Sequence, residues 1–77
     1  MDLTENQRKV ILVLTTEWQT PIQIADQLPE APENLSVVQQ TLKDLLSEGL
    51  IQTNPVVLGL YRLTDEGKMK KQIVFKG

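Results

Sequence analysis

The stretch SVVQQTLKDLLSEGLIQTNPVVLGLYRLTDEG, residues 36 to 67, decides the fold of this 77-residue chain. It opens on Ser36-Val37-Val38-Gln39, which has the form of a capping box, where a hydroxyl and a side-chain amide satisfy backbone groups at a helix start. The predicted helix runs from Ser36 to Glu48, and Gly49 is the left-handed residue that commonly ends a helix. Its apolar residues share one face at helical spacing: Val38, Leu42, Leu45 and Leu46.

The residues after Gly49 predict a hairpin followed by a last helix. Residues 50–53 form the first predicted strand, Asn54-Pro55 a turn, and residues 56–63 the second strand. Gly59, inside that second strand, indicates a bulge or a local twist. Thr64 is placed to cap a final helix, in which Met69 and Ile73 lie four residues apart. Because residues 73–75 are β-branched and aromatic, this end is expected either to fray or to become extended.

The N-terminal part of the chain predicts a first helix that starts at Thr4. Thr4-Glu5-Asn6-Gln7 is a second capping box, and Glu5 lies four residues before Lys9, the favourable order for an ion pair. One apolar stripe is predicted, made of Val10, Ile11, Leu14 and Trp18. Leu12 and Val13 lie off that stripe, so this helix is either the buried centre of the domain or contacts a second chain.

A second, shorter helix is predicted to start at Thr20-Pro21, with a hydroxyl at the cap and proline at the first helical position. Its expected apolar face consists of Ile22, Ile24, Ala25 and Leu28. Pro29 should end it, and residues 29–35 form a proline-containing loop. The residues do not decide whether a short extra strand lies near Gln19 and Thr20.

Composition excludes several kinds of chemistry. The chain has no cysteine and no histidine, which excludes disulfides, thiolate nucleophiles and the commonest general base and metal ligand. We therefore expect no enzyme, no catalytic residues, no cofactor and no metal site. No apolar run approaches the roughly 20 residues of a membrane span, and residues 1–5 lack a basic signal-peptide start. The expectation is one domain over residues 1–77, without a membrane partner and located in the cytoplasm.

Charge is unevenly distributed along the chain. The net charge of −2 and the pI near 4.9 argue against a protein that is basic on all sides. Residues 1–66 hold all ten acidic groups and four basic ones, whereas residues 67–77 hold four lysines and no acid. This basic end either favours an anionic partner or complements the dipole of the last helix.

The order of these elements resembles a winged helix-turn-helix domain, in particular regulators of the MarR type. The resemblance runs from about Thr4 to Lys70 and is carried by Glu48-Gly49-Leu50-Ile51 and by Leu63-Thr64-Asp65-Glu66-Gly67, which match the "EGLI" and "LT-x-E-G" patterns around the wing. It implies a small α+β domain with three helices, a two-stranded β-wing and a C-terminal helix. Two features depart from the family: the loop at residues 29–35 is long, and the wing tip at residues 53–56 has no basic residue.

The resemblance implies sequence-specific binding of double-stranded DNA, as in small bacterial or phage transcriptional regulators, with helix 36–48 in the major groove. Glutamine can bond adenine bidentately and lysine can reach guanine or phosphate, while hydroxyls suit phosphate oxygens. The helix before the recognition helix would contact the DNA backbone. The predicted DNA-binding residues are Ser36, Gln39, Gln40, Lys43, Thr20, Gln23 and Arg62. The alternative for the residues of helix 36–48 is a solvated helix face, for Thr20 a helix cap, and for Arg62 an ion pair with an acidic neighbour such as Asp65.

A second hypothesis is a winged-helix module that binds protein instead of DNA, favoured by the acidic pI and the apolar wing. Residues 56–58, Val-Val-Leu, either pack under the hairpin or form a partner surface. An RNA-binding variant has few aromatic residues for stacking on bases. A further hypothesis is a homodimer, formed through the first helix at Trp18 or through the C-terminal helix; the alternative is that these side chains belong to the core. The C-terminal candidates are Met69, Ile73 and Phe75.

Overall fold

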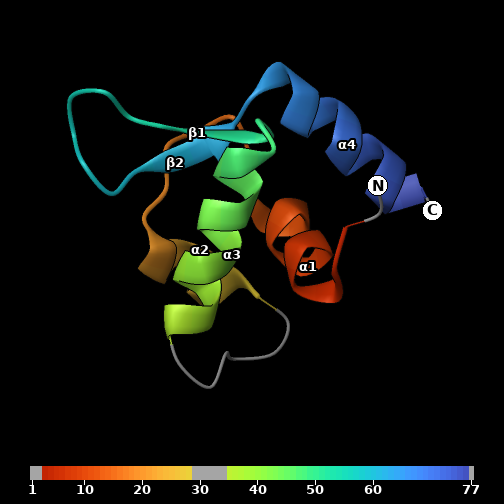
Figure 1. Cartoon of the computed structure of the whole chain (residues 1–77), viewed down its shortest axis with the longest axis horizontal. Coiled ribbons are helices and arrows are strands. Elements are labelled where there is room, and N and C mark those ends of the chain that lie inside the picture. The colour runs from red at the N-terminus through yellow and green to blue at the C-terminus, as the bar shows by residue number, and fades with distance from the viewer. Residues whose placement is uncertain (1–2, 29–34, 77) are drawn as a thin grey trace.

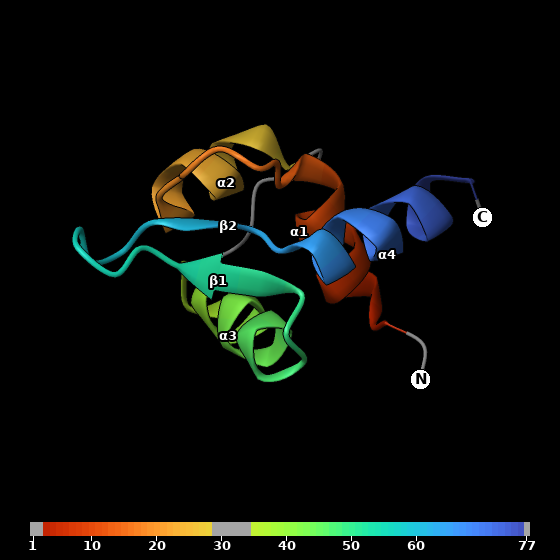
Figure 2. The same cartoon turned by 90° about the horizontal axis from the view of Figure 1, so that it is seen from above.

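The computed structural model describes residues 3–28 and 35–76, and within them it shows a small α+β domain of four helices and a two-stranded antiparallel sheet (Figure 1). The helices pack below and beside the sheet, and the loop between the strands projects away from the body on the side opposite the last helix (Figures 1 and 2). In chain order the elements are α1 (Glu5–Val13), α2 (Pro21–Gln27), α3 (Leu35–Ser47), β1 (Ile51–Thr53), β2 (Tyr61–Leu63) and α4 (Asp65–Lys76).

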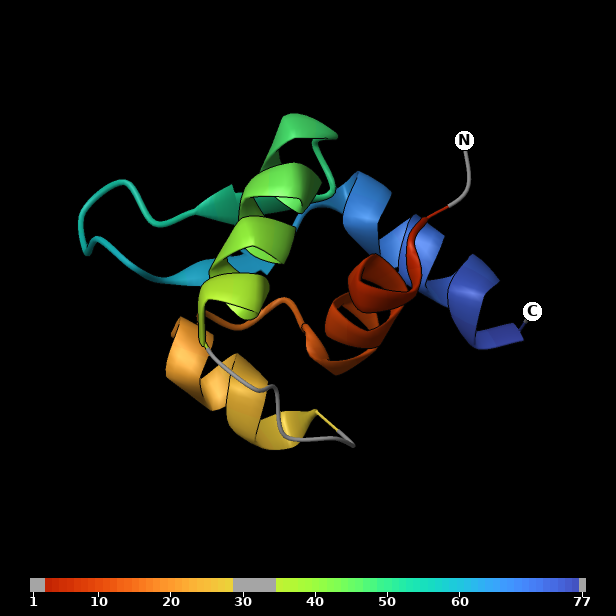
Figure 3. The same cartoon turned by 60° about the horizontal axis from the view of Figure 1, so that its bottom comes forward.

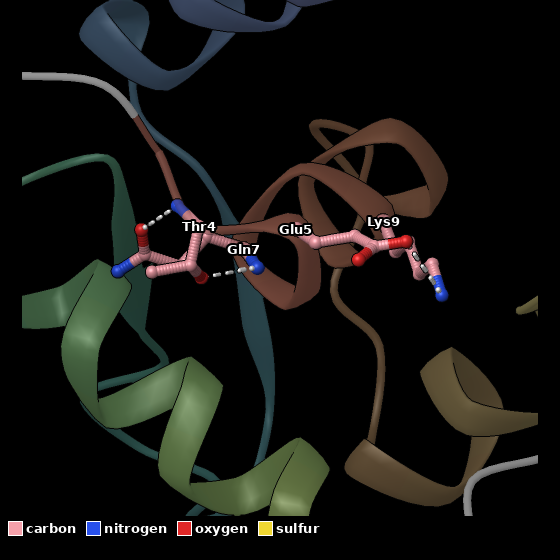
Figure 4. Close-up of polar contacts among 4 residues, drawn as sticks. All are labelled: Thr4, Glu5, Gln7 and Lys9. Atoms are coloured by element: carbon pink, nitrogen blue, oxygen red, sulfur yellow. Dashed lines mark hydrogen bonds and ion pairs between the residues drawn. The ribbon is translucent and has the colours of Figure 1, made fainter.

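The start of α1 confirms the predicted capping box (Figure 4). The Thr4 hydroxyl accepts from the Gln7 backbone N–H at 3.1 Å, and the Gln7 side-chain carbonyl accepts from the Thr4 N–H at 2.8 Å. One turn later the Lys9 ammonium lies 3.5 Å from the Glu5 carboxylate. The first helix therefore begins where the sequence places it, because every group involved lies within four residues.

The end of α1 differs from the prediction, since the helix stops at Val13 and Trp18 lies beyond it. Leu14 is already extended, with φ −72° and ψ 147°. The segment that follows bonds to the sheet instead of continuing the helix: the Leu63 N–H donates to the Thr15 carbonyl at 2.9 Å. Gln19 forms an isolated antiparallel bridge with Tyr61, so the extra strand that the sequence left undecided is present as a single bridge.

The second strand is shorter than predicted. β1 and β2 pair with Ile51 opposite Leu63 and Gln52 opposite Arg62, and the predicted strand residues 56–60 form an irregular loop instead. The Asn54 side-chain oxygen accepts from the backbone N–H groups of Val56 and Val57 at 2.8 and 2.9 Å. This local bonding competes with strand pairing. Gly59 has a φ of +86° and lies in that loop, so it is not a bulge inside a strand.

Helix α3 begins at Leu35, so Ser36 lies inside the helix and is not its N-cap as predicted. Residues 29–34, on which the predicted loop falls, lie outside the described residues. The C-terminal end of α3 confirms the role of Gly49, which has a φ of +74°. Its N–H donates to the Leu46 carbonyl and the Leu50 N–H donates to the Leu45 carbonyl, the bonds of a Schellman motif.

The core lies between α1, α2, α3 and the inner face of the sheet. Most of the residues predicted to be apolar core positions are buried. The prediction for Ile22 is wrong, because its side chain is 61% exposed on α2. Leu46 is only partly buried. The buried core residues are Val10, Ile11, Leu14, Ile24, Val38, Leu42, Leu45, Leu50, Ile51 and Leu63.

The first turn of α4 lies against the turn that follows α3, and the helix packs on α1 and β2. The Thr64 hydroxyl accepts from the Gly67 N–H at 3.0 Å and donates to the Gly49 carbonyl at 2.7 Å, which confirms Thr64 as the cap. Gly67 is buried so closely that a Cβ there would lie 1.9 Å from the Leu50 carbonyl oxygen. The helix continues through residues 73–75 to Lys76, and the Lys71 ammonium donates to the Leu14 carbonyl at 2.6 Å, beyond the end of α1.

Candidate nucleic-acid interface

The exposed face of α3 brings four of the predicted DNA-binding residues together. Ser36, Gln39, Gln40 and Lys43 are all exposed, and successive turns of the helix place them side by side at spacings of three and four residues. Val38, Leu42 and Leu45 are buried on the opposite face. We call the four exposed residues the α3 face; Figure 3 shows that no other element covers α3 along its length on the viewer's side.

The polar groups of the α3 face keep hydrogen-bonding capacity. The Gln40 side-chain N–H donates to the Asp44 carboxylate at 3.1 Å. A primary amide has two N–H donors and a carbonyl, so one donor and the acceptor of Gln40 remain, which is the pair that adenine recognition needs. Lys43 has no hydrogen bond or ion pair to any described residue.

The two acidic residues of α3 differ in their position relative to the α3 face. Asp44 borders it and would repel phosphate, although its carboxylate accepts from Gln40. Glu48 instead accepts from the side-chain N–H of Gln7 at 3.1 Å, which directs its carboxylate towards α1. The negative charge beside the α3 face is thus that of Asp44.

Thr20 and Gln23 form the capping box of α2. The Thr20 hydroxyl accepts from the Gln23 N–H at 3.1 Å, and the Gln23 side-chain carbonyl accepts from the Thr20 N–H at 2.9 Å. Capping uses the acceptor groups of both side chains and leaves the hydroxyl hydrogen and the amide N–H₂ as donors. A phosphate oxygen accepts hydrogen bonds, so Thr20 and Gln23 can cap α2 and still donate to the phosphate backbone of DNA. Helix α2 packs against α3 (Figure 3).

Arg62 lies apart from the α3 face. It pairs with Gln52 on the sheet, while the neighbouring pair Ile51 and Leu63 is buried in the core. Since successive side chains of a strand alternate, Arg62 and Gln52 occupy the outer face of the sheet. The guanidinium carbon is 4.2 Å from the centroid of the Trp18 ring, and no ion pair with Asp65 forms among the described residues.

A groove on the outer face of the sheet was not predicted from the sequence. It is open to solvent, has a volume of about 540 Å³ and lies between the α1–α2 linker, the sheet and the first turn of α4. Its residues come from four separate segments of the chain, so no local sequence motif marks it. One signal could have been used: Gln52 and Arg62 alternate with apolar residues along their strands, which predicts that both lie on the outer face of the sheet. The lining residues are Thr16, Gly49, Gln52, Arg62, Leu63, Thr64, Asp65, Glu66 and Lys68.

The loop between the strands exposes its apolar residues. Val56, Val57 and Leu58 are 85%, 53% and 91% exposed, so the expectation that they pack under the hairpin is wrong. The sequence from residue 50 to residue 61 contains no charged side chain. We call Val56, Val57 and Leu58 the apolar tip.

The candidate dimer residues are divided between two environments. Trp18 is half-buried beneath Arg62, while Met69, Ile73 and Phe75 are all exposed on α4. Leu12 of α1 is partly exposed, whereas Val13 packs against the core. The α4 side chains are therefore not core residues of the single chain.

Neither a metal cluster nor a membrane-spanning helix is found in the part of the chain that the structure describes. No three acidic residues there gather around a common point at which an ion could bind, and no helix is long and apolar enough to cross a bilayer. Comparison with protein-family models and with curated proteins gives no match.

Proposed function

We propose that this chain is a winged-helix domain that binds double-stranded DNA, with α3 in the major groove. The observation that carries the proposal is the α3 face, which presents two glutamines, a lysine and a serine on the exposed side of a helix whose opposite side packs into the core. These side chains are the ones that read base edges and phosphates. A transcriptional regulator of the MarR-like type is the role that the sequence resemblance implies.

The arrangement of elements supports a winged helix. α2 and α3 pack against each other, and β1 and β2 form a hairpin with a projecting loop. Gln19 pairs with Tyr61 of β2 in a single antiparallel bridge. The DNA contacts that this arrangement supports are those of the α3 face, with Thr20 and Gln23 as backbone donors. Arg62 is not part of this surface, because it lies on the outer face of the sheet.

The test is a titration of the labelled protein with a mixed-sequence duplex, followed by NMR at low and near-physiological salt. We expect shifts at Ser36, Gln39, Gln40 and Lys43 that weaken steeply with salt, because phosphate contacts release counterions. Lys43→Ala should lower the affinity and reduce the slope of log K against log salt by about 0.9 if Lys43 contacts one phosphate.

The matched control is Lys76→Ala, which removes the same charge at the exposed end of α4. An equal loss of affinity in both variants would mean that only net charge matters, and the α3 assignment would fail. No shift on α3 at any salt concentration would remove the DNA proposal altogether.

A second candidate function, a protein-interaction module, is favoured by the apolar tip. Three large apolar side chains at the end of an uncharged loop are unsuited to phosphate and suited to an apolar pocket of a protein. This function becomes the leading one if the duplex titration gives no shifts.

A further inference from the structure

The groove on the outer face of the sheet has the size and lining of a site for a small polar molecule. Its volume of about 540 Å³ falls within the range of roughly 300–1,000 Å³ that is usual for ligand pockets. Among its lining residues Leu63 is apolar and Gly49 has no side chain, and the other seven carry hydroxyl, amide or charged groups. A ligand there must therefore be polar over most of its surface.

The charged groups of the groove are of both signs and do not pair with each other. Arg62 and Lys68 are cationic, Asp65 and Glu66 anionic, and all four line the same groove. No two of these four groups form an ion pair within 4.0 Å; among the described residues such a pair is formed by Lys9 and Glu5, on α1. Each of the four groups in the groove therefore keeps its charge available to a ligand.

Arg62 lies over the ring of Trp18. A guanidinium stacked on an aromatic face keeps its N–H donors in its own plane, at its edges. Those donors match the two oxygens of a carboxylate in a bidentate pair. The guanidinium carbon lies 4.2 Å from the centroid of the ring, so this contact favours one position of Arg62 and leaves its N–H donors available to a carboxylate.

We propose that this groove binds a small zwitterion of the α-amino-acid class. The ligand carboxylate pairs with Arg62 and Lys68, and its ammonium group pairs with Asp65 and Glu66. A simple anion would be repelled by the two carboxylates and a simple amine by the two cations, whereas a zwitterion compensates both. The proposal does not depend on DNA binding, because the α3 face and the groove lie on different surfaces of the domain.

The experiment is a set of NMR titrations of the whole chain with the free L-amino acids, one at a time, at millimolar concentration. Acetate, methylamine and inorganic phosphate serve as single-charge probes. We expect at least one amino acid to shift the indole N–H of Trp18, the only tryptophan, together with the Gln52 amide. The single-charge probes should not shift these signals at the same concentration, and the α3 signals should not move.

Two variants test the roles of the charges. Arg62→Lys should weaken binding about tenfold, or about 1.4 kcal/mol, because an ammonium cannot form the bidentate pair. Asp65→Asn, at an exposed position, should also weaken it, and Lys76→Ala, outside the groove, should leave it unchanged. The proposal is overturned if no amino acid shifts the groove signals, if acetate or phosphate binds as well as the amino acid, or if both groove variants keep the original affinity.

Discussion

Replacing Gly67 by alanine separates the two physical effects that act at this position. In an exposed helix interior the change stabilises by about 1 kcal/mol, because alanine is the better helix former. Here the new Cβ would lie 1.9 Å from the Leu50 carbonyl oxygen, 2.9 Å from the Leu50 carbonyl carbon and 3.1 Å from the Leu63 side chain. Two of these atoms belong to the backbone and cannot rotate away.

The expected magnitude follows from the displacement that is required. Ordinary contact begins at 3.4 Å, so α4 and Leu50 must separate by about 1.5 Å (3.4 minus 1.9). Overpacking typically costs about 1–3 kcal/mol. The same movement strains two hydrogen bonds that Thr64 donates, one to the Leu50 carbonyl at 3.1 Å and one to the Gly49 carbonyl at 2.7 Å. Each contributes about 1 kcal/mol to the free energy of unfolding. After the gain in propensity, we expect a net loss of about 2–4 kcal/mol.

Urea unfolding followed by circular dichroism measures this loss directly. A domain of this length is expected to have a total stability of roughly 4–12 kcal/mol, so the variant should show a large fall in its midpoint. Gln72→Ala, on the exposed side of the same helix, is the control and should change stability by less than about 0.5 kcal/mol. A Gly67→Ala protein as stable as the original, or more so, would refute the close approach of α4 to Leu50.

Three further substitutions test other parts of the structure. Thr64→Val removes the cap of α4 and its bond to Gly49, and should cost about 1–2 kcal/mol in urea unfolding; no loss would mean that α4 is capped otherwise. Gln7→Ala removes the α1 capping box and the bond to Glu48, with an expected cost of about 1–2 kcal/mol by thermal unfolding, and a change below 0.5 kcal/mol would contradict the burial of Gln7. Leu58→Asn should leave the unfolding free energy within about 0.5 kcal/mol, because Leu58 is 91% exposed, and a larger loss would show that the apolar tip is packed.

The parts of the fold that the sequence predicted correctly are governed by neighbours in the chain. The capping box at Thr4, the hydroxyl cap at Thr20, the left-handed Gly49 and the cap at Thr64 all act within a few residues. The buried and exposed faces of α3 likewise follow from helical periodicity, so the candidate DNA-binding residues on that helix are exposed as expected.

Two of the errors arise where backbone groups bond to other partners than the sequence pattern predicts. The apolar stripe of α1 continues to Trp18 in the sequence, but strand pairing with residues 61–63 extends the chain after Val13. The predicted strand over residues 56–60 contains β-branched residues, yet the Asn54 side chain takes the backbone N–H groups that a strand would use. Residue preferences of a fraction of a kcal/mol are too small to decide against such contacts.

The sequence by itself determined the starts of α1, α2 and α4, the buried and exposed faces of α3, and the chemical types of residue available for binding, because these depend on spacing and composition. The tertiary structure alone decided that Arg62 stacks on Trp18 away from α3, that Gly67 must be small, and that the apolar tip is exposed. These features join residues as far apart as 18 and 62, and such contacts depend on which surfaces meet when the chain packs. Their energies come from burial and close approach between segments, which local periodicity does not encode.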